Sequence, residues 1–304
     1  MTIKIAFLCL AHNNFDLLPY LSQYYSSNND DFFLHIDKKI DIKQVKNLHR
    51  NSIVLDSDQR NRTRWGTFNI VAATLGLLEK AMAHGHYDHF ILVSGADIPL
   101  LTKVDLKQKL CADLSYMSLW QTITPDQKIP ASHEFFHRHY YHSHLTNPGE
   151  AYLTKNKLRI YAMLITNKLI ALMPRNIDFN FPTYVKGSQW WSITHELATY
   201  LVAEMRKENN ISEFSAMHAP DEKALQTIAF NSPYANKINF DQSQESLKQG
   251  LHYIDWGLKL AKPALQKFSV TQVNHAKQFN CAFARKVVHN DIESFIPHLK
   301  TITI

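Results

Sequence analysis

The chain has 304 residues, of which 45% are hydrophobic and 20% charged, and these fractions predict a globular protein with a large buried core. Its three cysteines, Cys9, Cys111 and Cys281, are widely spaced and form no CxxC pair, which argues against a disulfide framework or a thiolate zinc site and favours a reducing compartment. The formal net charge of +6 suits an anionic small molecule or a membrane surface, whereas the scattered basic residues match no nucleic-acid-binding motif, so we expect no nucleic-acid partner.

Strand and helix patterns alternate through the first hundred residues. Short apolar runs at residues 3–10, 32–36, 52–55 and 90–93 predict strands, and apolar residues at helical spacing predict a helix over 69–83. The first run is too short to span a bilayer and no small-residue cleavage site follows it, so we expect a soluble chain that begins with a buried strand. The alternation predicts a largely parallel sheet covered on both faces, with ligands at the carboxyl ends of its strands, beside Ala11, His12, Asp37 and Asp97.

The second half of the chain has a less regular pattern. Residues 158–172, 190–205 and 222–230 are predicted to be largely helical. No low-complexity linker separates the halves, and with eight glycines and no internal repeat we interpret residues 1–304 as one compact domain with two lobes, 1–115 and 116–304.

An acidic pair, Asp221 and Glu222, follows Pro220 at the start of a helical pattern. The acids could cap that helix, because aspartate is a preferred N-cap residue. Alternatively, Glu222 could be a general base that removes a proton from a hydroxyl group. The spacing alone leaves both interpretations open.

Two adjacent cations, Arg285 and Lys286, follow a small apolar segment near the end of the chain. A guanidinium beside an ammonium suits a diphosphate whose charge grows as it leaves. The alternative is an ordinary solvated surface pair, since arginine and lysine are rarely buried.

Aromatic side chains lie beside polar ones in three segments. Gln189 and Trp190, which follow a glycine, could stack on a sugar face and hydrogen-bond its hydroxyls, or could be core residues. Two other segments raise a similar question, because an aromatic ring beside a charged group can line a nucleotide pocket or simply anchor a loop. They are Arg64 with Trp65, and His252 with Asp255 and Trp256.

Two groups of residues imitate metal sites. Asp56-Ser57-Asp58 has the DxD pattern that can hold a divalent cation through carboxylate oxygens. The histidines of the second group lack the spacing of a zinc motif, and we expect no metal at His137, His139, His142 and His144.

Taken in order, these segments resemble glycosyltransferase family 14, which contains core-2 β-1,6-N-acetylglucosaminyltransferases and protein xylosyltransferases. The resemblance covers nearly the whole chain. Its pieces are residues 5–7 leading to Ala11-His12, the segment 33–38, Arg64-Trp65-Gly66, the segment 90–99, Gly187-Ser188-Gln189-Trp190-Trp191, Pro220-Asp221-Glu222, Tyr253-Ile254-Asp255-Trp256 and Phe283-Ala284-Arg285-Lys286.

The resemblance implies a GT-A-like, Rossmann-like fold, inversion at the anomeric carbon, and Glu222 as the catalytic base. It implies that Arg285 and Lys286 contact the UDP diphosphate, so that neither a metal nor another cofactor is expected and Asp56-Ser57-Asp58 is a bystander. Residues 1–115 then form the nucleotide-binding lobe and 116–304 the acceptor-binding and catalytic lobe. The residues expected to bind the nucleotide are Ala11, His12, Asp37, Arg64, Trp65 and Asp97, and those expected near the donor sugar or acceptor are Gln189, Trp190, Asp221, His252, Asp255 and Trp256.

Two departures from the family pattern bear on specificity. His252 stands where related sequences often have arginine, and Gln189 stands where xylosyltransferases have an acid, which disfavours xylose transfer. The animal members have membrane anchors and several disulfides. We expect neither in this chain, which therefore resembles a bacterial, cytoplasmic relative.

We therefore expect transfer of N-acetylglucosamine from a UDP-sugar to a glycan or glycolipid acceptor, such as a lipopolysaccharide or capsule intermediate, with a possible peripheral contact at the inner membrane. The alternatives are a metal-dependent glycosyltransferase that uses Asp56 and Asp58, xylosyl or glucuronosyl transfer, and a non-catalytic glycan- or nucleotide-binding protein.

Overall fold

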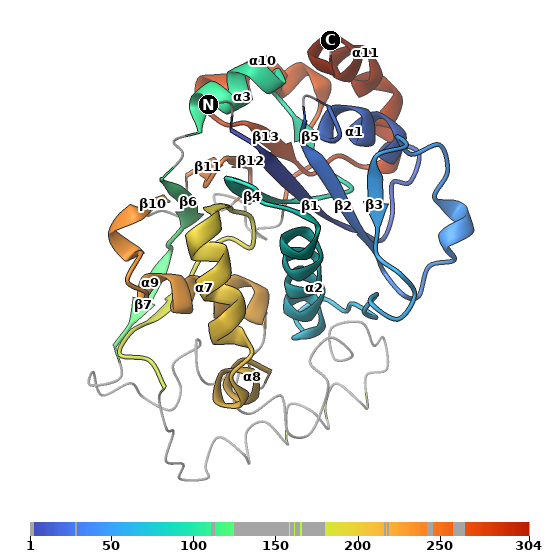
Figure 1. Cartoon of the computed structure of the whole chain (residues 1–304). Helices are drawn as coiled ribbons and strands as arrows, with labels where there is room; N and C mark the ends of the chain where they lie inside the picture. The colour runs from blue at the N-terminus through green and yellow to red at the C-terminus, as the bar shows by residue number, and fades with distance from the viewer. Residues whose placement is uncertain are drawn as a thin grey trace.

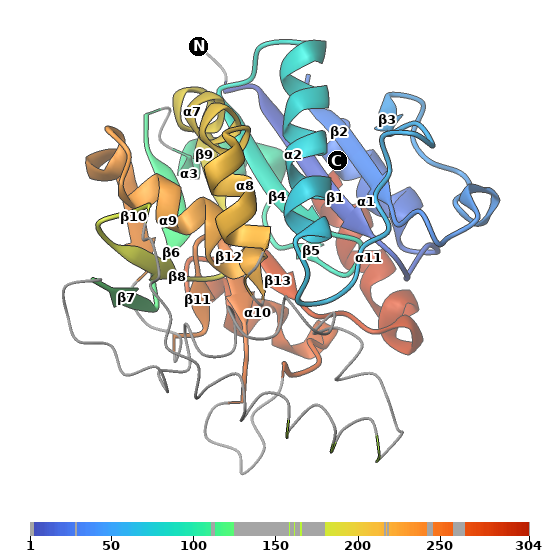
Figure 2. The same ribbon diagram turned by 90° about the horizontal axis from the view of Figure 1, so that it is seen from below.

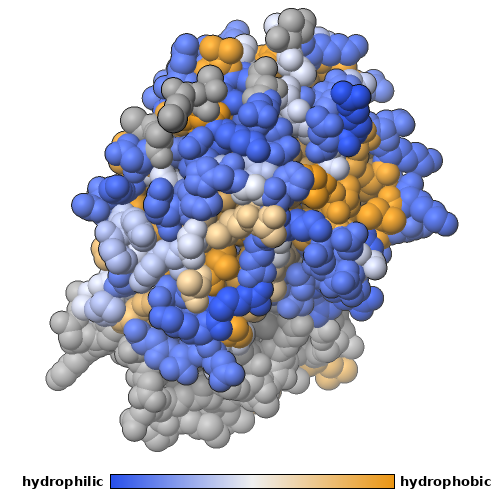
Figure 3. Space-filling model, in the orientation of Figure 1, coloured by the Kyte–Doolittle hydropathy of each residue, from blue (hydrophilic) through white to orange (hydrophobic). Residues whose placement is uncertain are grey.

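The computed structural model describes residues 3–27, 29–110, 113–124, 180–215, 217, 219–241, 246–257 and 265–303, together with three isolated helical positions, 158, 161 and 165 (Figure 1). None of the described helices combines the length and the apolar content that crossing a bilayer requires. The face of the molecule in Figure 3 is mostly hydrophilic, and hydrophobic side chains gather on it only in smaller patches.

A seven-stranded sheet forms the centre of the molecule, in the order β10-β6-β9-β4-β1-β2-β3. Its strands are β1 (Ile5–Ala11), β2 (Asp31–Ile36), β3 (Ser52–Val54), β4 (His89–Ser94), β6 (Ser115–Ser118), β9 (Ser192–Thr194) and β10 (Ile238–Asp241). Strands β4, β1, β2 and β3 are parallel to one another, and β6 is parallel to β10, whereas β9 runs antiparallel to both β4 and β6. The prediction of a mixed α/β protein with a largely parallel, GT-A-like central sheet is confirmed.

Helices cover both faces of this sheet because the side chains of its central strand alternate between two cores. Ile5, Phe7 and Cys9 of β1 point into a core shared with α1 (Leu18–Tyr25) and α11 (Ile292–Thr303). The intervening Ala6 and Leu8 point into a second core with α2 (Asn69–His84) and α7 (His195–Met205). Figure 2 shows α2 and α7 on one side of the sheet and α11 behind it.

The remaining helices lie around these two layers. They are α3 (Lys103–Lys109), α8 (Glu208–Ser215), α9 (Ala224–Phe230) and α10 (Val273–Gln278). Five short 3-10 helices connect elements of the described chain: η1 (Ile42–Gln44), η2 (Pro220–Glu222), η3 (Ala235–Lys237), η4 (Val270–Gln272) and η5 (His289–Asp291).

Two smaller sheets bring distant segments to the central one. The first has the order β11-β12-β13-β5, and its strands are β11 (Lys248–Gln249), β12 (His252–Ile254), β13 (Phe283–Arg285) and β5 (Ile98–Pro99). The antiparallel pairing of β13 with β5 places Ala284 opposite Ile98, so the C-terminal segment reaches the turn that follows β4. The second sheet pairs β7 (Gln121–Ile123) with β8 (Tyr184–Lys186).

The predicted first-half elements and the helix predicted over 222–230 are confirmed to within a residue or two, and the prediction over 190–205 is wrong at its start. Residues 192–194 form strand β9, and the helix begins only at His195. The helix expected from residue 222 begins at Ala224, because Pro220–Glu222 turn as a 3-10 helix. Most of the predicted helix 158–172 lies outside the described residues.

Candidate functional site

The carboxyl ends of the parallel strands bring polar groups together at one edge of the central sheet. The backbone amide of Asp37, just after β2, donates to the carbonyl of Ala11 at the end of β1 (2.9 Å). The Asp37 carboxylate is buried and accepts from the hydroxyl of Thr63 and from the amide of Lys39 (2.9 Å). His12, the next residue along from Ala11, has its pKa lowered by burial and by Lys286, so it is neutral at neutral pH.

A cavity of about 710 Å³ opens at this edge. Its lining includes Trp65, whose side chain is 60% exposed. The residues predicted for the site that line the cavity are Ala11, His12, Asp37, Arg64, Trp65, Gln189, Trp190, Asp221, Glu222, Trp256, Arg285 and Lys286. The fold therefore gathers twelve predicted residues, from positions 11 to 286 of the chain, around one space large enough for a small ligand.

The acidic pair enters the cavity from a tight turn. Ala219, which precedes η2, has a left-handed backbone (φ 47°), and its amide donates to the carbonyl of Gly66 (3.1 Å). The carbonyl of Glu222 accepts from the amide of Gly187 (2.8 Å), and Oε2 of Glu222 lies 3.6 Å from Nζ of Lys186. The N-cap of α9 is Lys223, so the alternative that the acids cap this helix is wrong.

The Asp221 carboxyl group titrates near neutral pH. Burial and the adjacent Glu222 raise the pKa of Asp221 to about 7. Its Oδ1 atom is buried and makes no hydrogen bond with the described residues. The pair therefore carries one negative charge more readily than two.

The two C-terminal cations line the same cavity as the acidic pair. Only 10% of the Arg285 side chain is exposed, its Nη1 lies 3.3 Å from Oδ1 of Asp97, and its guanidinium lies 3.9 Å from the ring centre of Trp190. Lys286 is partly buried, and burial together with Arg285 lowers its pKa. For Arg285, the alternative of a solvated surface cation is wrong.

Three predicted site residues do not line this cavity. Asp97 and His252 are both fully buried. Asp255 accepts from the amide of Gly257 (2.8 Å) beside the cavity, while its neighbour Trp256 reaches it. Neither side chain reaches the cavity, because the turn after β4 folds Asp97 back onto Ser94, and His252 on β12 stacks on Phe283 inside the fold. Their predicted contact with a ligand stays a prediction.

Sequence patterns did not identify several residues at this site. The buried His35 accepts from the amide of Asn61 through Nε2 (2.8 Å), and burial lowers its pKa to about 4. The only sequence signal for Lys186 was its place beside Gly187, and nothing in the sequence pointed to Thr63 as the partner of Asp37.

The DxD-like triplet lies apart from the cavity. The Asp56 side chain is 72% exposed and Oδ2 lies 3.6 Å from Nζ of Lys80, and Asp58 is exposed. Within the described part of the chain, no three histidine, cysteine, aspartate or glutamate side chains gather as a metal site would require. The segment with His137, His139, His142 and His144 lies outside the described residues.

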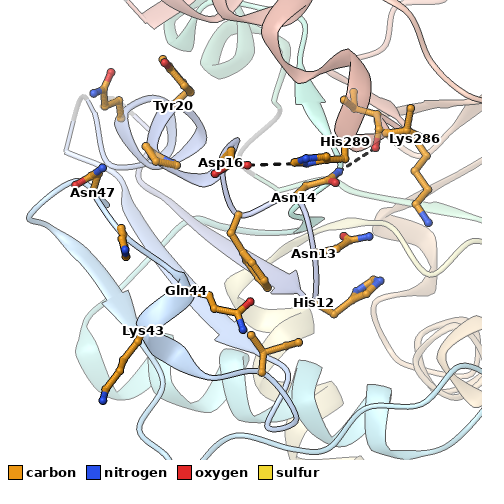
Figure 4. A pocket seen from close by; sticks show the side chains of 17 residues that line it. His12, Asn13, Asn14, Asp16, Tyr20, Lys43, Gln44, Asn47, Lys286 and His289 are labelled. Carbon is orange, nitrogen blue, oxygen red and sulfur yellow. Dashed lines mark hydrogen bonds and ion pairs between the residues drawn. The ribbon is translucent and has the colours of Figure 1, made fainter.

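A second cavity, of about 1190 Å³, adjoins the first (Figure 4). His12, Asn13 and Lys286 line both cavities and lie together on one side of the view. Asp16 and His289 also line this cavity, and Nδ1 of His289 lies 3.9 Å from Oδ2 of Asp16 (dashed line in Figure 4). No sequence pattern indicated this cavity.

Comparison with protein families gives one match over nearly the whole chain. The family model described as Core-2/I-Branching enzyme matches residues 5–295. A comparison with curated proteins gives no match.

Proposed function

The chain belongs to the Core-2/I-branching enzyme family and is a glycosyltransferase, and we propose that it transfers N-acetylglucosamine from UDP to a hydroxyl group of a glycan or glycolipid acceptor with inversion at the anomeric carbon. The observation that supports this proposal best is that Glu222 and the pair Arg285–Lys286 line one cavity. The reaction releases a proton from the acceptor hydroxyl and a negatively charged diphosphate from the donor. A carboxylate can accept that proton, and two cations can stabilise that diphosphate.

The proposed reaction is a single in-line displacement. Glu222 takes the proton of the acceptor hydroxyl as its oxygen bonds to the anomeric carbon, and the bond from that carbon to the diphosphate oxygen breaks. Arg285 and Lys286 stabilise the negative charge on the departing UDP. No second acid is required, because UDP leaves as a stable anion.

The other lining residues divide between the two ends of the donor in this proposal. Asp37, Arg64 and Trp65 bind the nucleoside, with Ala11 and His12 beside it at the end of β1. Gln189, Trp190 and Trp256 bind the donor sugar or the acceptor, because indole rings stack on sugars and the Gln189 amide can hydrogen-bond their hydroxyls.

Fixed positive charge makes a metal ion unnecessary for diphosphate departure in this proposal. The Arg285 side chain is only 10% exposed and Lys286 is partly buried, and screening by water is weak there, so their charges act strongly. We propose lipopolysaccharide or capsule intermediates as acceptors and a peripheral contact with anionic lipid, which suits the formal net charge of +6.

Replacement of the proposed base tests this function. We expect Glu222→Gln to lower kcat by about 10²- to 10⁴-fold, because the amide cannot take the proton, while UDP affinity and the melting temperature change little. Turnover of UDP-N-acetylglucosamine with a glycan acceptor and calorimetric UDP titration measure the two effects. Glu196→Gln, at an exposed position of α7, is the matched control. Full transferase activity of Glu222→Gln would refute the assignment.

A further inference from the structure

Asp97 occupies the turn that leads from β4 to β5, and its side chain is hydrogen-bonded to Ser94 at the end of β4. The amide of Ser94 donates to Oδ2 of Asp97 (2.6 Å), and the Ser94 hydroxyl donates to Oδ1 (2.9 Å). The residue has no solvent exposure and lies outside the cavity lining. Two hydrogen bonds from one residue fix the direction in which the carboxylate faces.

Strand pairing brings Arg285 to that carboxylate. Because β13 runs antiparallel to β5 with Ala284 opposite Ile98, the next residue of β13, Arg285, lies beside Asp97. The two side chains form an ion pair, with Nη1 3.3 Å from Oδ1. Arg285 also lines the cavity, so it bridges a fully buried acid and the ligand space.

The indole ring of Trp190 also contacts the guanidinium. The ring centre of Trp190 lies 3.9 Å from the guanidinium carbon, within the range of a cation–π contact. Trp190 and Phe283 both pack near His252, at ring distances of 5.8 and 5.0 Å. Burial and, to a smaller extent, the charge of Arg285 lower the pKa of His252 well below its ordinary value. The imidazole is therefore neutral and does not compete with Arg285 for the negative charge of Asp97.

We propose that Asp97 is a positioning residue, which with Trp190 holds the Arg285 guanidinium toward the diphosphate of the donor. This inference rests on the proposed function. A buried arginine needs a fixed partner to offset its desolvation, and Asp97 is that partner. Asp97 does not line the cavity, so it acts on a bound nucleotide through neighbours that do, Ser94 and Arg285. Of these two, Arg285 carries the charge that would attract a diphosphate.

Binding of UDP and of uridine to Asp97→Asn tests this inference. Uridine lacks the phosphates, so a loss transmitted through Arg285 weakens UDP and spares uridine. We expect calorimetry to show about 10-fold weaker UDP binding, with an unchanged dissociation constant for uridine. In an Arg285→Ala background the same Asp97→Asn change is expected to have no further effect on UDP, because the group through which it acts is gone.

Several outcomes would overturn the inference. These are equal weakening of UDP and uridine, equal effects of Asp97→Asn with and without Arg285, or unaltered UDP binding by Asp97→Asn. Ser94→Ala keeps the carboxylate but removes two hydrogen bonds, the one that the hydroxyl donates to Asp97 and the one that it accepts from the amide of Ala96. This variant provides the test if Asp97→Asn does not fold, with about 3-fold weaker UDP binding and unchanged uridine binding expected. The proposed function fails separately, if the unmodified protein binds no UDP.

Discussion

Asp221 is the side chain whose charge depends most directly on its surroundings near neutral pH. Its pKa is raised to about 7 from an ordinary value of 3.8, first by burial and then by Glu222. Between about pH 4 and pH 7, the folded protein therefore keeps a proton on Asp221 that the unfolded chain has already released. The protonated form contributes its full stability below pH 4, and this contribution is lost as the pH rises through 7.

We predict that Asp221→Asn abolishes the loss of stability that Asp221 causes as the pH rises through 7, because the amide stays neutral at every pH. The unfolding free energy of the variant, relative to that of the unmodified protein, should rise by about 2–4 kcal/mol between pH 4.5 and pH 8. Urea denaturation at the two pH values measures the difference. Asp58→Asn, at an exposed position, is the matched control and should add little. A parallel pH dependence in Asp221→Asn and the unmodified protein would contradict the assignment.

At the scale of elements, Gly187 links strand β8 to the proposed catalytic turn. Its amide donates to the carbonyl of Glu222 (2.8 Å), and its backbone lies against the carbonyl of Ser118 on β6. A Cβ atom at this position would lie 1.7 Å from that oxygen, far inside van der Waals contact. The two nearest atoms are the carbonyl oxygen and carbonyl carbon of Ser118, at 1.7 and 2.7 Å, and both belong to the backbone, so a side-chain rotation cannot relieve the clash.

We predict that Gly187→Ala displaces this segment and lowers both stability and activity. The cost should be about 3 kcal/mol or more, because overpacking against backbone atoms forces the chain to shift. Chemical denaturation and transferase assays measure the two losses. Gly76→Ala, within α2, is the matched control: its Cβ would meet only Leu55, at 3.9 Å, and the change should stabilise the helix by about 0.5–1 kcal/mol. Equal behaviour of the two variants would contradict this role for Gly187.

Periodicity predicted the first half of the fold because its elements are long and uniformly patterned. Strand β1 is buried along nearly all of its length, and α2 has apolar residues at helical spacing over four turns. The start of the segment from residue 190 failed because Trp191, Ile193 and Leu197 are all buried, and a three-residue strand followed by a helix has no single period. Local pattern carries no information on the pairing of β9 with both β4 and β6.

Motif order singled out twelve residues that line the cavity, and three that do not. It does not tell which way a side chain points. Asp97 turns inward because Ser94 supplies two donors, and the His252 ring packs inward between Phe283 and Trp190. Lys186 lies near Glu222 only through the fold, across a sequence separation that no local motif spans.

At the scale of the whole molecule, the cavity joins distant parts of the chain. Its lining runs from Leu10 to Lys286, and the central sheet includes strands from both sides of residue 115. The C-terminal helix α11 packs with α1 in one core. The division into a nucleotide-binding lobe (1–115) and a catalytic lobe (116–304) stays a prediction, and a ligand in the cavity would contact residues of both.

We predict that UDP stabilises the whole protein, because a ligand that binds only the folded state shifts the unfolding equilibrium. At 100 times its dissociation constant, UDP should add about 2.7 kcal/mol to the unfolding free energy and raise the melting temperature by about 5 °C. Calorimetric melting should show the same rise with EDTA present, since Arg285 and Lys286 supply the positive charge, and a much smaller rise in Arg285→Ala. Glu222→Gln should keep the rise, because the proposed base contacts the acceptor hydroxyl and not the nucleotide. A rise that disappears with EDTA would instead favour a metal-held diphosphate, and an equal rise in Arg285→Ala would remove this residue from the nucleotide site.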